Sequence, residues 1–240
     1  MISLLKKTLL LSLCLLIVFN LAACNSWYYS QSKADKIYIA KDDDKEMYSV
    51  KAPEGQWKVL DSAAKTNASY TFRMHLNPYV SYRFNVHTLF LHLSKYPKVK
   101  ELVELNDYTQ FIEGHINGEA FKANSKNRGA RNVYGKVTYI AGLQCMEIGW
   151  DSHIGPSPDS NSQWAGLGAY EKIIMFSCYM RKGENYRKLK VLAFFNIADK
   201  HLAAENQNQY LLSPPEIEED FRRRIQRSFD SFDFYGFSQD

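Results

Sequence analysis

Residues 170–198, YEKIIMFSCYMRKGENYRKLKVLAFFNIA, decide the fold class of this chain. β-Branched and aromatic side chains, which favour strands, are concentrated in residues 170–182 and 186–198. The three residues that join these segments, Gly183-Glu184-Asn185, are typical of a short turn. The stretch therefore predicts a β-hairpin.

Further strands are expected on both sides of this hairpin. Polar and apolar residues alternate with the period of a half-buried strand in several segments, and Pro53-Glu54-Gly55 and Asn77-Pro78 mark turns between them. Residues 79–93 are compatible with one long strand or two, and residues 132–151 with two adjoining strands or one strand bent near Gly142. The expected strands are residues 36–41, 46–53, 56–62, 69–76, 79–93 and 132–151.

Two segments predict helices. Apolar residues recur at three- and four-residue steps within residues 98–118, and Asn117-Gly118 is a suitable stop. Residues 213–229 begin with Ser213 as N-cap and two prolines, carry acids first and arginines last, and place an apolar stripe every four residues. This stripe (Ile217, Phe221 and Ile225) is expected to dock on a sheet. Residues 122–132 and 155–168 are predicted to be loops.

The order of strands, helix, strands and terminal helix contains no parallel βαβ rhythm. We therefore predict an α+β fold with a largely antiparallel sheet flanked by helices. It is expected to form a single domain over residues 36–240.

The first 23 residues have the composition of a secretory signal. Lys6 and Lys7 precede an apolar run that is too short to span a bilayer comfortably. The segment Leu21-Ala22-Ala23-Cys24 resembles the bacterial lipobox. This resemblance implies cleavage before Cys24 and lipid attachment to its thiol, with acyl chains such as palmitate. Two alternatives are an ordinary signal cut after Ala23, with Cys24 as a free thiol, and an anchor that is never cut.

The lipoprotein interpretation predicts a chain held at a membrane by its N-terminal lipid. Residues 24–35 would be a lipidated tether, and the absence of Asp at position 25 implies transfer to the outer membrane, facing the periplasm. Loss of residues 1–23 removes two lysines, so the formal net charge falls from +4 to +2. This near-neutral charge argues against a dedicated nucleic-acid-binding protein.

Two cysteines remain for the folded domain in an oxidising compartment. Cys145 and Cys178 both lie in expected strands, and a disulfide between them is the favoured interpretation. The alternative is two buried free thiols. Two isolated cysteines lack the spacing of a metal site.

No pattern in the sequence predicts catalysis, a metal or a cofactor. His87 and His92 fall on opposite faces of one strand, and Gly155-Pro156-Ser157-Pro158-Asp159 lacks the second glycine of a nucleophile elbow. An enzyme built from scattered residues remains an alternative, as a cell-wall or lipid hydrolase. The better candidates are residues for contact with a protein partner: Asp159 and Trp164 in one loop, and Arg128, Arg131 and Tyr134 in a basic stretch.

The domain resembles Mog1/PsbP-like sandwiches in Gln56-Trp57-Lys58-Val59 and in the C-terminal segment from Ile225 to Phe234. Lipoproteins of this kind include immunity proteins of type VI secretion systems. The resemblance implies a non-enzymatic, lipid-anchored periplasmic protein that occludes a secreted antibacterial effector. The alternative function is an envelope assembly or maintenance lipoprotein without a toxin partner.

Overall fold

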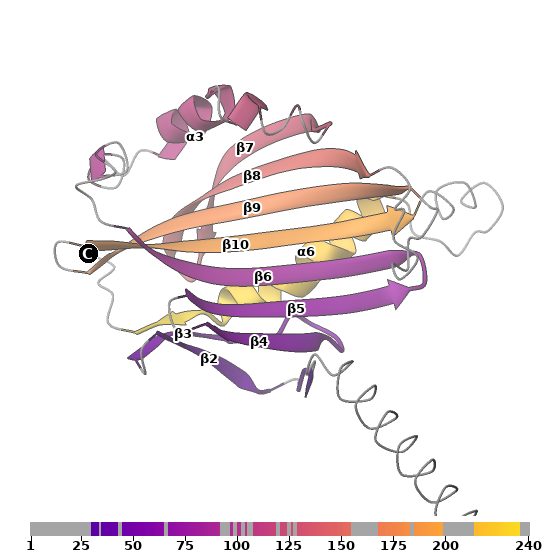
Figure 1. Cartoon of the computed structure of the whole chain (residues 1–240), viewed down its shortest axis with the longest axis horizontal. Helices are drawn as coiled ribbons and strands as arrows, with labels where there is room; N and C mark the ends of the chain where they lie inside the picture. The colour runs from indigo at the N-terminus through magenta and orange to yellow at the C-terminus, as the bar shows by residue number, and fades with distance from the viewer. Residues whose placement is uncertain are drawn as a thin grey trace, which may run out of the picture. The chain divides into compact units, whose positions relative to one another are not determined.

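The computed structural model is an α+β fold in which antiparallel strands predominate (Figure 1). Contacts between residues group the chain from Gln31 onward into one compact unit. The structure describes residues 30–33, 35–42, 45–64, 67–91, 97, 100–101, 104, 108–118, 121–123, 126, 129–154, 168–182, 185–198 and 214–235.

Eight strands form the main sheet, in the spatial order β1-β4-β5-β6-β10-β9-β8-β7. Every pairing from β4 through to β7 is antiparallel. At the centre, β6 pairs with β10, so that Val80 lies opposite Ile197. The bounds are β1 (Ser30–Gln31), β4 (Lys58–Ala64), β5 (Asn67–Asn77), β6 (Val80–Leu91), β7 (Arg131–Ile140), β8 (Leu143–Ile154), β9 (Ala169–Lys182) and β10 (Asn185–Ala198).

A small antiparallel sheet and one helix cover one face of the main sheet. The small sheet has the order β11-β3-β2, with β2 at Ile37–Asp42, β3 at Lys45–Lys51 and β11 at Asp233–Phe234. The helix α6 (Pro214–Asp230) lies behind the main sheet in Figure 1. Aromatic and aliphatic side chains from all these elements form the larger hydrophobic core.

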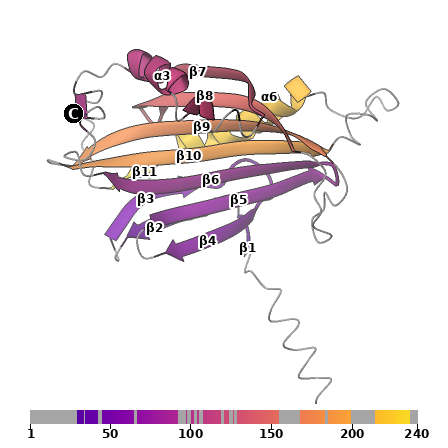
Figure 2. The ribbon, with the colours of Figure 1, turned by 45° about the horizontal axis from the view of Figure 1, so that its top comes forward.

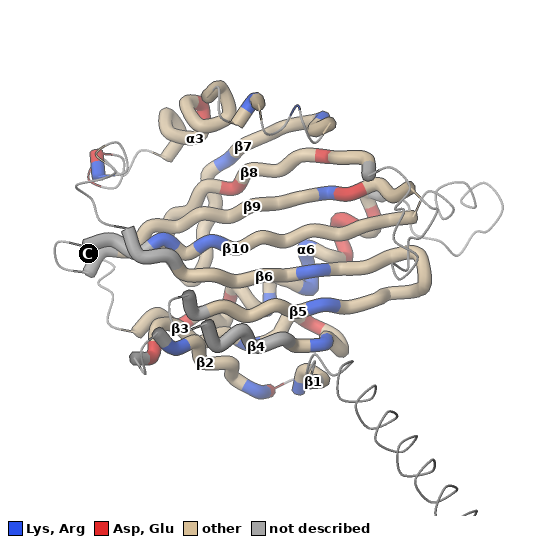
Figure 3. The backbone as a smooth tube through the Cα atoms, in the orientation of Figure 1, with Lys and Arg blue, Asp and Glu red and all other residues tan. Residues whose placement is uncertain are grey.

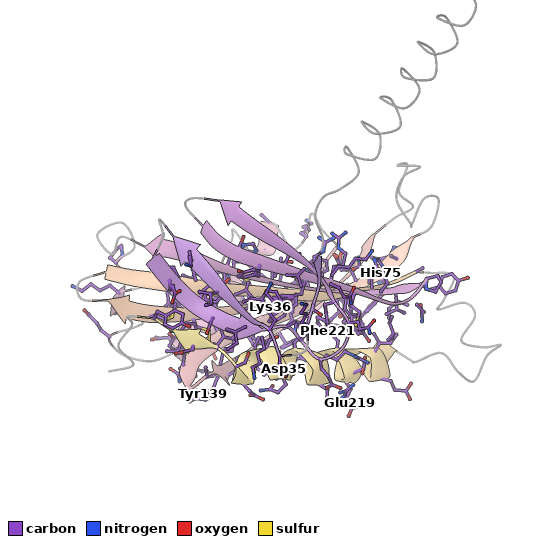
Figure 4. The ribbon with its side chains drawn as sticks, turned by 90° about the horizontal axis from the view of Figure 1, so that it is seen from below. Asp35, Lys36, His75, Tyr139, Glu219 and Phe221 are labelled. Carbon is purple, nitrogen blue, oxygen red and sulfur yellow. A yellow bond between two sulfur atoms is a disulfide. The ribbon has the colours of Figure 1, made fainter. Side chains whose placement is uncertain are left out.

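The expected apolar stripe of α6 is confirmed. Ile217, Phe221 and Ile225 are fully buried or nearly so, and in Figure 4 Phe221 lies between the helix and the sheet while Glu219 lies on its outer side. Beyond the helix, Ser228 Oγ donates to the Lys51 carbonyl at 2.8 Å. The chain then adds β11 to the edge of β3, which fixes the C-terminal segment to the small sheet.

The second helix, α3 (Tyr108–Asn117), packs on the opposite face of the main sheet, close to β7 and β8 (Figure 2). Its Tyr108 and Ile112 are buried against Met146, Ile148 and Trp150 of β8. This smaller core extends across β7, β8 and β9 to Leu192 and Phe194 of β10. α3 ends at Asn117, as Asn117-Gly118 predicts.

Three segments differ in detail from the sequence expectations. Residues 122, 123 and 126, expected in a loop, are helical, and β7 already begins at Arg131. Residues 132–151 form two strands of a hairpin whose turn places Ala141 and Gly142 at positive φ. Residues 79–93 contain the single strand β6.

The junction with the expected tether also differs from the prediction. Ser30–Gln31 form β1 beside β4, and Ser32 N–H donates to the Trp57 carbonyl at 2.6 Å. Trp57 N–H in turn donates to Ser32 Oγ at 2.9 Å. The last residues assigned to the tether are therefore part of the fold, because strand pairing satisfies their backbone groups. Residues 1–23 and Cys24 lie outside the described residues.

The disulfide predicted between Cys145 and Cys178 is present. The two residues are direct neighbours on β8 and β9, and their Cα atoms are 4.3 Å apart. Both side chains are buried. The bond therefore links β8 and β9, and each of these strands contributes side chains to both hydrophobic cores.

A side chain of the main sheet contacts the edge of the small sheet. Tyr70 O–H donates to the carbonyl of Ile39 in the edge strand β2 at 2.9 Å.

Across the residues that the structure describes, none of the helices combines the length and the apolar character needed to cross a bilayer.

Candidate functional site: a basic face on the main sheet

Three cations lie in one row across neighbouring strands of the main sheet. Lys58 of β4 is directly opposite Arg73 of β5, and Arg73 is directly opposite Arg83 of β6. Figure 3 shows the corresponding blue segments side by side on the three strands. Neighbouring strands are about 4.8 Å apart, so the row concentrates like charges that oppose one another directly.

The row lies on the face of the sheet opposite to α6. Phe72 and Phe84 point into the core under α6, so Arg73 and Arg83, one position further along, point to the other side. In Figure 4 the neighbouring His75 lies across the sheet from α6. The same alternation places Lys188 and Lys190 of β10 on this side, since Leu189 and Val191 are in the core. We call this surface the basic face; its residues are Lys58, Arg73, His75, Arg83, His87, Lys188 and Lys190.

Among the side chains of β4, β5, β6 and β10 that the structure describes, those at the alternate positions that point to the basic face are uncharged or cationic. The neighbouring strand β9 adds one acidic residue to this side of the sheet, because Glu171 lies directly opposite Asn196 of β10. The face therefore carries a net positive charge, although the whole chain is close to neutral.

The pKa shifts on this face have two physical causes. Burial lowers the pKa of His75, and the nearby cations Arg73 and Lys58 lower it further. Burial likewise lowers the pKa of His87, with a contribution from Lys190. Burial and Lys190 lower the pKa of Lys188 to about 8. The neighbouring charges that shift these groups are all positive, so an anion placed here would relieve repulsion.

Aromatic rings support two of the cations. The guanidinium of Arg83 lies 4.8 Å from the ring centroid of Phe194, and the ammonium of Lys188 lies 5.4 Å from that of Tyr179. Cation–π contacts of this kind help to hold the two side chains in place. The arrangement can attract anions electrostatically.

A second charged cluster lies between α6 and the β7–β9 end of the sheet. Tyr134 O–H and Arg222 Nη2 both contact Glu147 Oε1 at 2.9 Å, and Lys136 Nζ is 3.5 Å from Oε2. The Glu147 side chain is only 3% exposed. Arg222 Nε also donates to Glu218 at 2.8 Å. Both Glu147 oxygens thus already have internal donors, so this cluster fixes α6 to the sheet.

Lys172 extends this cluster to a second carboxylate. Its Nζ is 2.9 Å from Asp151 Oδ1, which also accepts a hydrogen bond from Tyr170. Asn132 donates to Asp151 Oδ2 at 2.7 Å. These hydrogen bonds outweigh the effect of burial, which alone would raise the pKa, and hold the pKa of Asp151 below its ordinary value.

Two of the predicted partner contacts, Arg131 and Tyr134, lie among the described residues, both on β7. Tyr134, expected to meet a partner, is instead half-buried, and its hydroxyl is engaged by Glu147 and Arg222. The reason is that Tyr134 lies directly opposite Gly149, where its ring packs over the missing side chain. Arg131 is exposed at the start of β7, opposite Asp151. Arg128, Asp159 and Trp164 lie outside the described residues.

Metal ligands do not gather in the part of the chain that the structure describes, where no group of three or more His, Cys, Asp and Glu side chains has a suitable arrangement. Comparison of the chain with protein-family models, with curated proteins and with solved structures found no match.

Proposed function

We propose that this protein is a lipid-anchored binding protein of the bacterial envelope that occludes a secreted antibacterial effector. Its lipid would be carried by Cys24, and its folded part would face the periplasm from the outer membrane. The observation that carries the proposal is the junction at Ser32, which is hydrogen-bonded in both directions to Trp57. Only residues 25–29 separate Cys24 from β1.

A short connection of this kind holds a folded domain beside the membrane instead of releasing it on a long linker. Two or more acyl chains on Cys24 would supply the stable anchoring that a single chain does not. An inhibitor placed there would meet an effector as it arrives in the periplasm.

The contact surface of the proposal is the loop of residues 155–168, together with Arg131. Ile154 and Ala169, which flank the loop, are directly opposite each other at the ends of β8 and β9. Arg131 lies three positions from that end, because it is opposite Asp151. Trp164 would be the anchor of the contact, since large aromatic residues dominate binding energies.

The finer fold belongs to the same proposal. A Mog1/PsbP-like sandwich is supported by an antiparallel sheet with α3 on one face and α6 on the other. It is also supported by the C-terminal segment, where the ring centroid of Phe232 lies 5.8 Å from that of Tyr48 in the small sheet.

The paired ends of β8 and β9 allow a clean test. We would replace residues 155–168 by a four-residue Gly/Ser turn, which neighbouring strand ends can accept. Trp164→Ala and Arg131→Gln are the point variants, and Lys41→Gln on the small sheet is the control. Loss of effector binding with unchanged thermal unfolding is expected for the loop replacement, whereas unchanged affinity would contradict the proposed contact.

Growth experiments separate this function from its alternatives. Deletion of the gene is expected to leave cells healthy alone but sensitive to toxin-secreting siblings. A constitutive envelope defect would instead indicate an assembly or maintenance lipoprotein, and substrate turnover by the purified chain would indicate a hydrolase. Intact mass spectrometry of the mature chain tests the anchor, because a start at Cys24 with added diacylglyceryl and acyl mass is expected.

A further inference from the structure

The strand β7 lies at one edge of the main sheet and pairs only with β8. The pairing is regular from Tyr134 to Ile140, and the register shift lies before Tyr134. Among the described residues, no backbone hydrogen bond outside this pairing involves β7. The strand therefore offers the regular run from Tyr134 to Ile140 to a further strand.

The disulfide shows which backbone groups of β7 point away from β8. The Cα atoms of Cys145 and Cys178 are 4.3 Å apart, which is the spacing of a non-hydrogen-bonded pair. The N–H and C=O groups of Cys145 therefore point away from β9 and towards β7. Thr138 lies directly opposite Cys145, so the backbone groups of Thr138 are bonded to β8.

The turn between β7 and β8 gives the same result independently. Its central residues, Ala141 and Gly142, both have positive φ, as a type I′ hairpin turn requires. Such a turn is closed by a hydrogen-bonded pair, here Ile140 with Leu143, so every second residue before Ile140 is also bonded to β8. The groups that remain at the outer edge belong to Gly135, Val137 and Tyr139.

The side chains of this run do little to discourage a further strand. Tyr139 is 62% exposed, more than any other exposed large hydrophobic residue that the structure describes. Lys136 is the one charged residue between Tyr134 and Ile140, and its ammonium already lies 3.5 Å from Glu147. Proteins commonly protect an edge with unpaired charges or prolines, and this run contains neither.

We infer that β7 pairs in the antiparallel sense with β7 of a second copy of this chain, so that two main sheets join across a two-fold axis. Val137 is the middle residue of the regular run, and an axis beside it pairs the whole run with that of the other copy. Val137 then pairs with itself and Gly135 with Tyr139. These outward-facing residues exchange two hydrogen bonds in each pair, or about six in all.

The run is complementary to itself in this register. The ring of Tyr139 lies beside Gly135 of the other copy, where it gains contact with the isoleucines of α3 that cover this glycine, Ile112 and Ile116. Lys136 lies opposite Thr138, so like charges do not oppose one another. A shift of the axis to Lys136 would place two lysines opposite each other, which is unfavourable.

This complementarity favours a second copy over a strand from another protein. Each copy has one β7, so pairing through this edge closes at a symmetric dimer. The inference goes beyond the proposed function and depends on neither the lipid anchor nor the effector.

The test counts the copies of the full chain by native mass spectrometry in detergent. Micelles are kept in excess over protein, so that two copies do not share a micelle by chance. The protein concentration is varied from about 1 μM to about 1 mM. We expect an equilibrium between monomer and dimer. A chain that stays monomeric up to about 1 mM would overturn the inference.

Proline at position 139 tests whether this edge forms the dimer. Tyr139→Pro removes an N–H that points away from β8, a position at which edge strands tolerate proline. Each copy then loses one hydrogen bond to Gly135 of the other, so the dissociation constant should rise about 100-fold. Ile37→Pro is the matched control, because Ile37 is 54% exposed and begins the edge strand β2. A dimer that Tyr139→Pro weakens no more than Ile37→Pro would overturn the inference.

Substitutions at Thr138 test the register and remain informative if the proline variant fails to fold. Thr138→Lys places a cation opposite Lys136 of the other copy, whereas Thr138→Glu places an anion there. Two such pairs form in each dimer, so the dissociation constant should rise about ten-fold for Thr138→Lys and fall about ten-fold for Thr138→Glu. Equal effects of the two substitutions would overturn this register and, with it, the choice of a second copy.

Hydrogen exchange distinguishes a second copy from other occupants of the edge. The amides of Gly135, Val137 and Tyr139 should exchange fast at about 1 μM and slowly at concentrations where the dimer forms. Slow exchange in the monomer would overturn the inference in favour of a segment of the same chain. Fast exchange at every concentration would also overturn it, because the edge would then be open to a strand of another protein.

Discussion

At the scale of single residues, glycines determine how closely the charged cluster under α6 can pack. A Cβ atom at Gly149 would lie 2.4 Å from ring atoms of Tyr134, directly across the β7–β8 pair. The aromatic ring covers the glycine and thereby reaches Glu147 and Arg222. Tyr134 is thus positioned by the residue opposite to it and not by its place in a basic stretch.

Gly149→Ala should destabilise the fold by about 1–3 kcal/mol, because the ring must move and its hydroxyl leaves Glu147. Urea unfolding measures this cost in the native background and in Tyr134→Ser. In the second background the ring is absent, so we expect less than half the penalty. Equal penalties in both backgrounds would show that the ring contact does not cause it.

Lys188 gives a second prediction at this scale. Its pKa is lowered to about 8 by burial and by Lys190, while in the unfolded chain it returns to about 10.4. Between these values the unfolded state binds the extra proton, so the free energy of unfolding rises with pH by up to about 1.4 kcal/mol per unit. Lys188→Met should remove this rise between pH 8 and 10, and Lys190→Met should lessen it. A native chain whose unfolding free energy is flat over this range would contradict the shift.

At the scale of elements, the sequence predicts strands and helices well but predicts their partners only where a turn is recognisable. Arg73 and Arg83 are each five residues from Pro78, so interpretation of Asn77-Pro78 as a hairpin turn would have placed them opposite each other. Lys58 joins the row through the pairing of β4 with β5, in which Ala64 lies opposite Asn67, and the two residues between them, Lys65-Thr66, include no glycine or proline that would predict a reversal. The pairing of Arg73 with Arg83 could therefore be predicted from the sequence, whereas the position of Lys58 beside them could not.

The cluster around Glu147 could not be predicted in the same way. Its members come from β7, β8 and α6, and the position of Arg222 depends on how the terminal helix crosses the sheet. Helical periodicity gives the buried side of α6 through Ile217 and Phe221, but it does not specify which strands that side meets.

The helix α3 provides a matched pair of glycine substitutions. A Cβ atom at Gly114, on the exposed side of α3, would meet nothing within 4 Å, so Gly114→Ala should stabilise the protein by about 1 kcal/mol through helix propensity. A Cβ atom at Gly135 of β7 would lie 2.4 Å from Ile112 Cγ2, so Gly135→Ala should destabilise by about 1–3 kcal/mol. Thermal unfolding shows whether each substitution raises or lowers the stability of the protein. A stabilising effect of Gly135→Ala would contradict the docking of α3.

At the scale of the whole molecule, the central pairings of the main sheet should be the most stable part. β6, β10 and β9 each have a strand on both sides and carry buried residues such as Phe84, Phe176 and Phe195. We expect their backbone amides to exchange with solvent only through global unfolding. Amides of β2 and β11, in the small sheet, should exchange faster. Native-state hydrogen exchange with mass detection tests the order, and faster exchange in β10 than in β2 would contradict it.

The hydrogen bond from Tyr70 to Ile39 has a consequence for crowded surfaces. Exposed strand edges can recruit a further strand from a neighbouring copy, which is how ordered aggregates grow. The carbonyl of Ile39 in β2 already accepts a hydrogen bond from Tyr70 of the main sheet. Lys36 and Lys41 lie on either side of Ile39 along the chain. Copies held in two dimensions by the proposed lipid anchor would collide more often than copies in bulk solution, and an edge protected in this way would oppose their polymerisation.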